Sequence, residues 1–346
     1  MDMQTAIRTV ADGRDLDGDA MTAVMRTIMT GEATESQIGG FLIGLRMKGE
    51  TVEELAAAAR VMRGLAASVP VEPEGLVDTA GTGGDVSGTF NISTTAALIA
   101  AGAAVRIAKH GNRSGTSHSG SADVLQAAGV NIDLTPEQVA ECIARTGFGF
   151  MFAPHHHSAM RHAVGPRREM GARTIFNLLG PLTNPAGAPN QALGVFAPEW
   201  TGRIARVLRE LGSRHVLVYH SRDGLDEISI GAATRLAELK DGEVREYEVT
   251  PEELGLGRVR SDAEMDTLRV DSPEASAALM REVLDDRPGP ARDIALLNAA
   301  AAIHVSGAVA NLADGVEAAR ESVASGAARS ALAALVEVSN ALAEGS

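Results

Sequence analysis

The sequence has little of three things that define whole classes of protein: cysteine, aromatic residues and long apolar runs. Its one cysteine, Cys142, excludes an intramolecular disulfide, so a disulfide-stabilised secreted scaffold is ruled out and a reducing compartment is expected. Aromatic residues are only 3% of the chain, so Ala, Leu, Val and Met must fill the core. No apolar run approaches about 18 residues, and the N-terminus lacks the basic start and apolar core of a secretion signal. We therefore predict a cytoplasmic protein that does not span a membrane.

Positive charge is also scarce. The formal net charge is −14 and the isoelectric point is near 5.1, which argues against binding of nucleic acid or an anionic membrane, since both need an extended basic surface. An anionic substrate would instead be attracted by local basic clusters, which are Lys109 to Arg113 and Arg161, His162, Arg167 and Arg168. The chain has 346 residues, 45% of them hydrophobic, which is enough for two lobes with a large core.

The order of helix and strand signals divides the chain. The first 70 residues indicate helices only, with capping boxes in which Thr34 pairs with Gln37 and Thr51 with Glu54. From Leu76 onward, strand and helix patterns alternate, with strands expected at 76–80, 104–108, 148–153, 192–196, 216–220 and 227–231. This order predicts an α/β protein: a small all-helical N-terminal domain, then a large domain with a central, mostly parallel sheet.

A glycine-rich loop follows the first expected strand. The segment 81–85, Gly-Thr-Gly-Gly-Asp, precedes an Ala-rich run from Thr94 to Ala104 that predicts a helix. Such glycines let backbone N–H groups converge on phosphate oxygens, and the helix start adds its positive dipole end. The spacing matches neither a Walker A motif nor a dinucleotide-binding motif. A plain tight turn would explain these glycines about equally well, so the loop alone leaves both interpretations open.

A second polar loop favours the phosphate interpretation. The segment from Lys109 to Asp123, KHGNRSGTSHSGSAD, follows the strand expected at 104–108 and combines positive charge, hydroxyls and glycines. Open α/β sheets bind ligands at the carboxyl ends of their strands. Two consecutive strands that end in such loops therefore indicate one phosphorylated substrate.

Two adjacent carboxylates, Asp226 and Glu227, follow the strand expected at 216–220. Adjacent carboxylates repel one another unless a cation lies between them. Oxygen ligands without His or Cys favour Mg²⁺, which often shares its coordination shell with phosphates. Alone, such a pair would be better explained as a solvated acidic turn. Beside two phosphate loops, a Mg²⁺ site becomes the better interpretation.

Together these motifs resemble the anthranilate phosphoribosyltransferase family, tryptophan-biosynthesis enzymes with the nucleoside phosphorylase-like phosphoribosyltransferase fold. The matching segments are GTGGD (81–85), NIST (91–94), KHGNRS (109–114), SGSAD (119–123), RTIFNLLGPLTNPA (173–186) and DGLDEIS (223–229). Similarity also runs through 37–63 and 290–307, so the resemblance covers nearly the whole chain. Six motifs in the family's order make it specific.

The resemblance implies an activity and a domain division. The 5-phosphoribosyl group of phosphoribosyl pyrophosphate would pass to the amine of anthranilate, giving N-(5-phosphoribosyl)anthranilate and pyrophosphate. Residues 1–70 and a returning segment at about 161–185 would form the helical domain, which would also make a homodimer contact. Residues 71–160 and 186–346 would form the phosphoribosyl-binding α/β domain, with the active site in the cleft between the two.

The resemblance also implies site residues. Phosphoribosyl pyrophosphate would be surrounded by Gly81, Gly84, Asp85, Thr89, Asn91, Ile92, Ser93, Thr94, Lys109, His110, Gly111, Asn112, Arg113, Ser117 and Ser121. Of two Mg²⁺ ions per subunit, one would be shared by Ser93 and the diphosphate, and the other held by Asp226 and Glu227. Anthranilate would be contacted by Gly81, His110, Asn112, His157 and Arg167. We assign the anthranilate carboxylate to Arg167, whose guanidinium fork matches two oxygens. An arylamine is already uncharged at neutral pH, so we assign no catalytic acid or base.

Two rival functions stay open at this point. A pyrimidine nucleoside phosphorylase shares the fold, but inorganic phosphate does not require the DGLDE carboxylates. A non-catalytic relative that binds nucleic acid would need a basic groove, which the acidic isoelectric point argues against.

The run 155–157, three consecutive histidines, predicts a loop with at most one substrate-lining histidine, His157. Three neighbours in sequence cannot all face one metal ion in a regular element. The chain departs from the family pattern at Gly115, His118 and Ser158, and its Pro166 stands one place later than usual. We expect these departures to affect affinity and loop order, with Pro166 altering the approach to Arg167, and to leave the reaction type unchanged.

Overall fold

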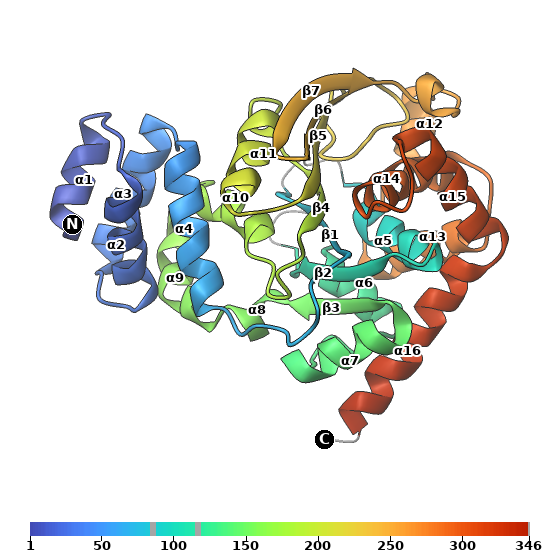
Figure 1. Ribbon diagram of the computed structural model, residues 1–346, viewed down its shortest axis with the longest axis horizontal. Coiled ribbons are helices and arrows are strands. Elements are labelled where there is room, and N and C mark those ends of the chain that lie inside the picture. The colour runs from blue at the N-terminus through green and yellow to red at the C-terminus, as the bar shows by residue number, and fades with distance from the viewer. Residues whose placement is uncertain (84–87, 115–118, 345–346) are drawn as a thin grey trace.

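The computed structural model describes residues 1–83, 88–114 and 119–344. Figure 1 shows a helical lobe at one end, a twisted sheet in the middle and a second group of helices beyond the sheet. Three predicted site residues, Gly84, Asp85 and Ser117, lie outside the described residues, as do Gly115 and His118.

Four helices begin the chain, as the sequence predicts. They are α1 Met3–Ala11, α2 Gly18–Met29, α3 Glu35–Lys48 and α4 Val52–Leu65. Both predicted capping boxes, at Thr34 and Thr51, are present. Two later helices, α9 (Arg161–Met170) and α10 (Ile175–Leu179), pack against α2, α3 and α4. A later part of the chain therefore joins the helical lobe, while the domain boundaries near residues 70, 160 and 186 stay a prediction.

A seven-stranded sheet forms the centre of the second lobe, in the order β3-β2-β1-β4-β5-β6-β7. Its strands are β1 Leu76–Gly81, β2 Arg106–Gly111, β3 Phe148–Phe152, β4 Asn190–Gly194, β5 His215–Ser221, β6 Thr234–Lys240 and β7 Glu243–Val249. The strands from β3 to β5 pair in parallel, whereas β6 and β7 are antiparallel. The predicted α/β fold with a mostly parallel sheet is confirmed.

The β6–β7 edge of the sheet differs from the prediction. The strand expected at 227–231 is wrong, because this segment is a loop in which the Ile228 N–H and C=O bond to the side chain of Asn298. The chain forms β6 and β7 instead, a hairpin that the sequence analysis did not anticipate. Its turn is Asp241-Gly242, with φ angles of 53° and 80°. Asp-Gly with two positive φ angles is the signature of a type I′ hairpin, so the signal was available.

Helices cover both faces of the sheet. The remaining helices are α5 Ile92–Gly102, α6 Ser121–Ala127, α7 Pro136–Thr146, α8 Ala153–His156, α11 Trp200–Glu210, α12 Asp262–Asp266, α13 Pro273–Leu284, α14 Pro290–Val305, α15 Leu312–Ala324 and α16 Ala327–Glu344, with 3-10 turns at Ser158–Met160, Gly180–Leu182 and Glu252–Leu254. Along β5, Leu217 and Tyr219 join the core with α5 and α14, while Val216 and Val218 join the core with α11 and the helical lobe. This alternation follows from the opposite directions of successive side chains in a strand. Among the described residues, no helix combines the length and apolar character that a membrane span requires.

Candidate active site

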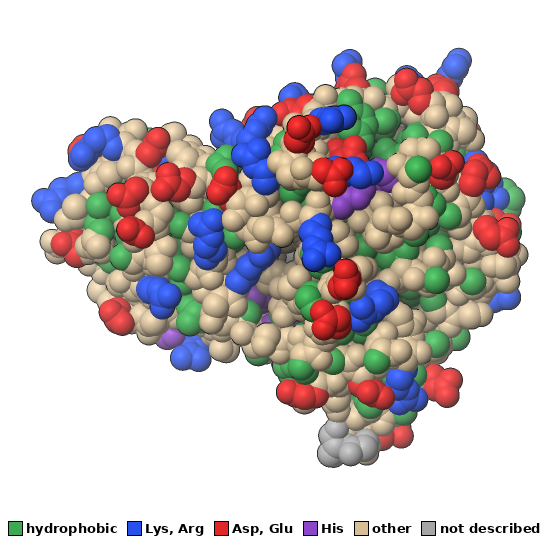
Figure 2. Space-filling view, in the orientation of Figure 1, with side chains coloured by type: hydrophobic (Ala, Val, Ile, Leu, Met, Phe, Trp, Pro, Cys, Tyr) green, Lys and Arg blue, Asp and Glu red, His purple; other side chains and the backbone are tan. Residues whose placement is uncertain are grey.

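A cavity of about 770 Å³ opens at the carboxyl ends of β1 and β2, where the helical lobe meets the sheet. Figure 2 shows lysine and arginine side chains gathered where these two parts of the molecule meet. The predicted residues that line the cavity are Gly81, Thr89, Asn91, Ile92, Ser93, Lys109, His110, Gly111, Asn112, Arg113, Ser121, His157, Arg167, Asp226 and Glu227. Thr94 is buried within α5 and does not line it; its hydroxyl donates to the Asn91 side chain. Motifs that are distant in sequence therefore meet around one cavity.

Close backbone packing brings the DGLDE loop against the first glycine loop. Gly81 and Gly194 are partners at the ends of β1 and β4. A Cβ on Gly194 would lie 1.7 Å from the carbonyl oxygen of Asp226, and a Cβ on Gly81 would lie 3.1 Å from Asp226 Oδ2. Gly194 must therefore be glycine for Asp226 to sit here, and Gly81 leaves room for its carboxylate.

Lys109 brings a buried cation to the start of α5. Its side chain is only 2% exposed, and Nζ donates to the carbonyl oxygen of Thr79, to Thr79 Oγ1 at 3.2 Å and to Ser93 Oγ at 3.3 Å. Burial lowers the pKa of Lys109 to about 8, against the opposing effect of Asp78 and Glu227. This lysine is thus held by neutral oxygens beside Ser93, where an anionic ligand would favour its charged form.

A second buried group, Asp78, supports the end of β2, and the sequence analysis missed it. Its Oδ1 accepts the backbone N–H of His110 at 3.1 Å. Burial raises the pKa of Asp78 to about 6, opposed by a hydrogen bond from Asn184 and by the charge of Lys109. The Asn184 amide also donates to the carbonyl oxygen of Ala108 at 2.8 Å. Together Asp78 and Asn184 fix the strand end that carries Lys109 and His110.

His110 and His157 face each other across the cavity wall, with ring centres 5.0 Å apart. Burial lowers the pKa of His110 to about 3 and that of His157 to about 4, and neighbouring histidines add to both shifts. Both imidazoles are therefore neutral at pH 7. Among the described residues, neither Nε2 atom has a hydrogen-bond partner. Two buried, neutral ring nitrogens beside the cavity are thus left with unused hydrogen-bonding capacity.

Arg167 is the basic side chain that α9 presents to the cavity. Its guanidinium lies 5.2 Å from the centre of the Phe176 ring, and burial lowers its pKa below the ordinary value without neutralising it. No carboxylate within the described part of the chain forms an ion pair with it. Pro166, displaced in the sequence pattern, is accommodated inside α9. Arg167 is therefore a cation prepared for an anionic ligand.

The second polar loop is held by an internal ion pair. Asp123 on α6 bonds Arg113 Nη1 at 2.8 Å and accepts the backbone N–H groups of Ser114 and Gly120 at 3.0 Å. Arg113 also lies 5.6 Å from the centre of the Phe152 ring. These contacts fix the described part of the loop around the cavity and partly neutralise Arg113.

The donor set at the mouth of the sheet fits Mg²⁺. The Asp226 and Glu227 carboxylates and the Ser93 hydroxyl line the same cavity, and all three offer oxygen atoms to a hard cation. The negative charge of Glu227 also raises the pKa of Lys109, so this carboxylate and the buried ammonium interact electrostatically. A Mg²⁺ ion held here would stand beside the phosphate loops.

Several lining residues were not assigned from the sequence. They include Met62, Arg173, Phe176 and Asn177, and also Arg161, which the sequence analysis named only as part of a basic cluster. Residues 173–177 lie inside a motif used for the family resemblance, so a signal existed for three of them. Met62 and Arg161 come from helices of the other lobe, and only the packing of the two lobes places them here.

The neutral histidines predict a pH dependence of stability. Because the folded-state pKa of His157 is below the unfolded value of about 6.5, the unfolded state gains a proton first, and stability is lost as pH falls below about 6.5. Between pH 7 and about pH 5, titration of His157 should lower the unfolding free energy of the wild type by about 2 kcal/mol. The His157→Gln variant should lack this part of the loss. Urea unfolding at both pH values measures this. His155→Gln, at an exposed histidine that pairs with Asp133, is the control; equal pH dependence in wild type and His157→Gln would contradict the account.

Comparison with known proteins identifies the family. The Glycosyl transferase family helical bundle domain matches residues 4–66, and the Glycosyl transferase family a/b domain matches residues 73–329. An anthranilate phosphoribosyltransferase from Thioalkalivibrio sulfidiphilus is 62% identical over 336 residues, covering 97% of this chain and 98% of that relative.

Solved structures agree over the full length. The crystal structure of anthranilate phosphoribosyltransferase from Thermus thermophilus superposes with a TM-score of 0.91 at 43% identity, covering 97% of this chain and 99% of that one. The enzyme from Saccharomyces cerevisiae in complex with PRPP and Mg has a TM-score of 0.89 at 25% identity, covering 98% of both chains. Since both lobes and the whole cavity fall within these matches, the chain belongs to the anthranilate phosphoribosyltransferase family.

Proposed function

We propose that this protein transfers the 5-phosphoribosyl group of phosphoribosyl pyrophosphate to the amine of anthranilate, releasing pyrophosphate, as a step of tryptophan biosynthesis. One observation carries the proposal: two phosphate-type loops, a carboxylate pair and Arg167 all line a single cavity. The loops and carboxylates belong to the α/β lobe, whereas Arg167 lies on the helical side and forms no ion pair with a carboxylate of the described residues. The proposal is tested by incubating the protein either with phosphoribosyl pyrophosphate and anthranilate or with a pyrimidine nucleoside and inorganic phosphate. Turnover of phosphoribosyl pyrophosphate with anthranilate is expected, and phosphorolysis of a pyrimidine nucleoside with inorganic phosphate would instead support the rival function.

The phosphoribosyl pyrophosphate subsite is assigned to the strand ends and the start of α5. Lys109 beside Ser93 supplies a buried positive charge, and Gly81 lets the Asp226 carboxylate approach the end of β1. Asn91 and Asn112 add polar side chains that line the cavity. Donors held in place before the reaction stabilise developing charge better than mobile water does.

Mg²⁺ is the metal that this subsite fits. The yeast relative forms a complex with PRPP and Mg, which supports Mg²⁺ binding here. We assign one ion to Ser93 together with the diphosphate and a second to Asp226 and Glu227, two per subunit. Bound Mg²⁺ neutralises charge on the diphosphate. Titration with Mn²⁺ followed by paramagnetic resonance, in the presence of phosphoribosyl pyrophosphate, should give two equivalents that excess Mg²⁺ displaces; a single such equivalent would reject the second ion.

The reaction needs orientation and charge stabilisation more than proton transfer. The arylamine is uncharged at neutral pH, so it can attack the anomeric carbon without a strong base. We assign neutral His110 and His157, whose Nε2 atoms have no partner among the described residues, to the amine side, and Arg167 to the carboxylate, which is on the adjacent ring carbon. Pyrophosphate leaves with several negative charges, and we assign Lys109, which bonds Ser93, to stabilising that charge.

Arg167→Ala should raise the KM for anthranilate about 10- to 100-fold, because a charged hydrogen-bonded pair contributes roughly 1.5–3 kcal/mol. The KM for phosphoribosyl pyrophosphate should change much less. Arg168→Ala is the matched control, since Arg168 is the next residue, is exposed and does not line the cavity. Steady-state kinetics with each substrate varied in turn measures the effect. A change confined to phosphoribosyl pyrophosphate would mean that Arg167 belongs to the other subsite.

We further infer that the helical lobe forms a homodimer and that the enzyme works in the cytoplasm. Three exposed large apolar side chains, Met47 on α3, Leu65 on α4 and Val164 on α9, belong to helices of this lobe, and we take them as support for an interface there. Sedimentation at micromolar concentration should give twice the monomer mass, and a monomer would contradict the dimer. The buried free thiol of Cys142 suits a reducing compartment; recovery of the protein outside the cytoplasm on cell fractionation would contradict this location.

A further inference from the structure

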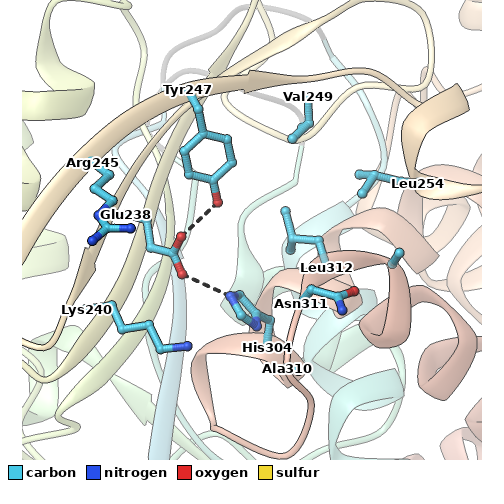
Figure 3. Close-up of a pocket in the computed structure, with 11 residues that line it drawn as sticks. Glu238, Lys240, Arg245, Tyr247, Val249, Leu254, His304, Ala310, Asn311 and Leu312 are labelled. Atoms are coloured by element: carbon cyan, nitrogen blue, oxygen red, sulfur yellow. Dashed lines mark hydrogen bonds and ion pairs between the residues drawn. The ribbon is translucent and has the colours of Figure 1, made fainter.

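A second cavity, of about 440 Å³, lies between the β6–β7 hairpin and the loop that joins α14 to α15. At its wall, Nε2 of His215 and Nε2 of His304 lie 2.8 and 2.9 Å from the same carboxylate oxygen, Glu238 Oε1. The other oxygen, Oε2, accepts the Tyr247 hydroxyl at 3.0 Å. Figure 3 shows Glu238 between Tyr247 and His304, with its carboxylate facing the cavity. None of these residues lines the catalytic cavity.

We propose that His215, Glu238 and His304 form a binding site for one divalent transition-metal ion, best suited to Zn²⁺. Two imidazole nitrogens and one carboxylate oxygen are a ligand set that Zn²⁺ uses, with a fourth position left for water. The candidate ligand atoms all lie within 4.8 Å of one another, and within the described part of the chain no other three His, Cys, Asp or Glu residues meet this criterion. This assignment is independent of the Mg²⁺ site in the catalytic cavity.

The distances need little adjustment to accept an ion. Zn²⁺ binds His nitrogen and carboxylate oxygen at about 2.0–2.2 Å, which separates tetrahedral ligand atoms by roughly 3.3 Å. Nitrogen-to-oxygen distances of 2.8 and 2.9 Å must therefore widen by a few tenths of an ångström. The His215 and His304 side chains are 11% and 5% exposed and that of Glu238 is 17% exposed. The ligands are thus held by packing, and the cavity beside Glu238 and His304 provides an entry path.

Two further contacts resemble the outer shell of a metal site. His304 Nδ1 lies 3.4 Å from the carbonyl oxygen of Val309, so its N–H can face the carbonyl and leave the Nε2 lone pair for a metal. The Tyr247 hydroxyl fixes the Glu238 carboxylate from the other side. The ligands come from β5, β6 and α14, so a bound ion would clamp the antiparallel edge of the sheet to α14. A bound ion would take the Nε2 lone pair of each imidazole, so each ring would carry its hydrogen on Nδ1.

The test uses the full-length protein, freed of metal by a chelator and returned to buffer with excess Mg²⁺. Calorimetric titration with Zn²⁺ should give one equivalent in the wild type, and Co²⁺ should produce the visible absorption of a tetrahedral ion. Thermal unfolding should shift upward with added Zn²⁺. His304→Gln and Glu238→Gln should each weaken Zn²⁺ binding by more than about 100-fold. His155→Gln, which alters an exposed histidine paired with Asp133, should keep the full equivalent.

Two results would overturn the site. Wild-type protein that binds no equivalent of Zn²⁺ or Co²⁺ in excess Mg²⁺ would mean that the three side chains form a hydrogen-bonded structural network only. Binding of equal strength in His304→Gln would place the ion elsewhere. Circular dichroism checks that each variant is folded. If a variant fails to fold, wild-type NMR decides, because Zn²⁺ must shift the imidazole resonances of two histidines; unshifted resonances likewise reject the proposal.

Discussion

Replacing Asp226 and Glu227 together by Asn and Gln should lower kcat by about 100- to 1,000-fold or more. Both carboxylates line the cavity beside Ser93 and Lys109, and removing one preorganised electrostatic contact to developing charge already lowers rates by about that factor. The loss should be in kcat more than in anthranilate binding, because Arg167 is untouched. Stopped-flow and steady-state kinetics at several Mg²⁺ concentrations measure kcat and anthranilate binding.

The matched control is Glu252→Gln with Glu253→Gln, another adjacent carboxylate pair, which lies on the 3-10 turn Glu252–Leu254 and outside the cavity. It should leave kcat and its Mg²⁺ dependence unchanged. If the Asp226 and Glu227 variant also turned over at the wild-type rate across all Mg²⁺ concentrations, the metal assignment would be rejected.

Lys109→Met should lower kcat/KM for phosphoribosyl pyrophosphate by about 10- to 100-fold, the effect of losing a charged hydrogen-bonding partner of roughly 1.5–3 kcal/mol. The methionine side chain has a similar length, so it should fill the buried space. The variant leaves Asp78 buried without its cation, so its pKa should rise further. Anthranilate binding, measured by fluorescence titration, should change little.

Lys240→Met is the control for this variant. Lys240 is exposed and lies outside the catalytic cavity, so its loss removes the same charge from the chain without touching the site. Equal kcat/KM for phosphoribosyl pyrophosphate in the wild type and Lys109→Met would show that the buried ammonium does not contact the diphosphate, and the subsite would have to be reassigned.

Much of the fold follows from local patterns in the sequence. The capping boxes at Thr34 and Thr51 begin helices as predicted, because a hydroxyl that satisfies a free N–H is a local signal. Strand limits are less certain from sequence. The strand expected to begin at Ala104 begins at Arg106, since Ala104 has a φ of 64° and still belongs to the turn.

The β6–β7 edge of the sheet shows why tertiary contacts limit such predictions. The alternation of Ile228, Ser229 and Ile230 resembles a strand, but the Ile228 backbone groups bond to the Asn298 side chain on α14, a partner 70 residues away in sequence. The hairpin that forms instead has charged outward positions, which weakens its apolar pattern. Only its Asp241-Gly242 turn is a strong local signal.

The residues of the candidate site also differ in how well the sequence predicts them. Loop residues such as Ser93 and Lys109 are recognisable from motifs, because two consecutive strands end in polar, glycine-containing loops and these motifs follow the family's order. Asp78 is not, since a lone carboxylate within an apolar strand gives no local sign that it will be buried beneath His110. The pairing of His215, Glu238 and His304 depends on how α14 lies on the sheet, which no local pattern contains.

The most direct test of the central claim is the fluorescence of anthranilate after addition of phosphoribosyl pyrophosphate, with Mg²⁺ and with a chelator in its place. The account predicts a rapid, Mg²⁺-dependent loss of fluorescence, with one pyrophosphate released per anthranilate consumed. Unchanged fluorescence from folded protein that still binds phosphoribosyl pyrophosphate would contradict it, and the acceptor would then be a different amine or base.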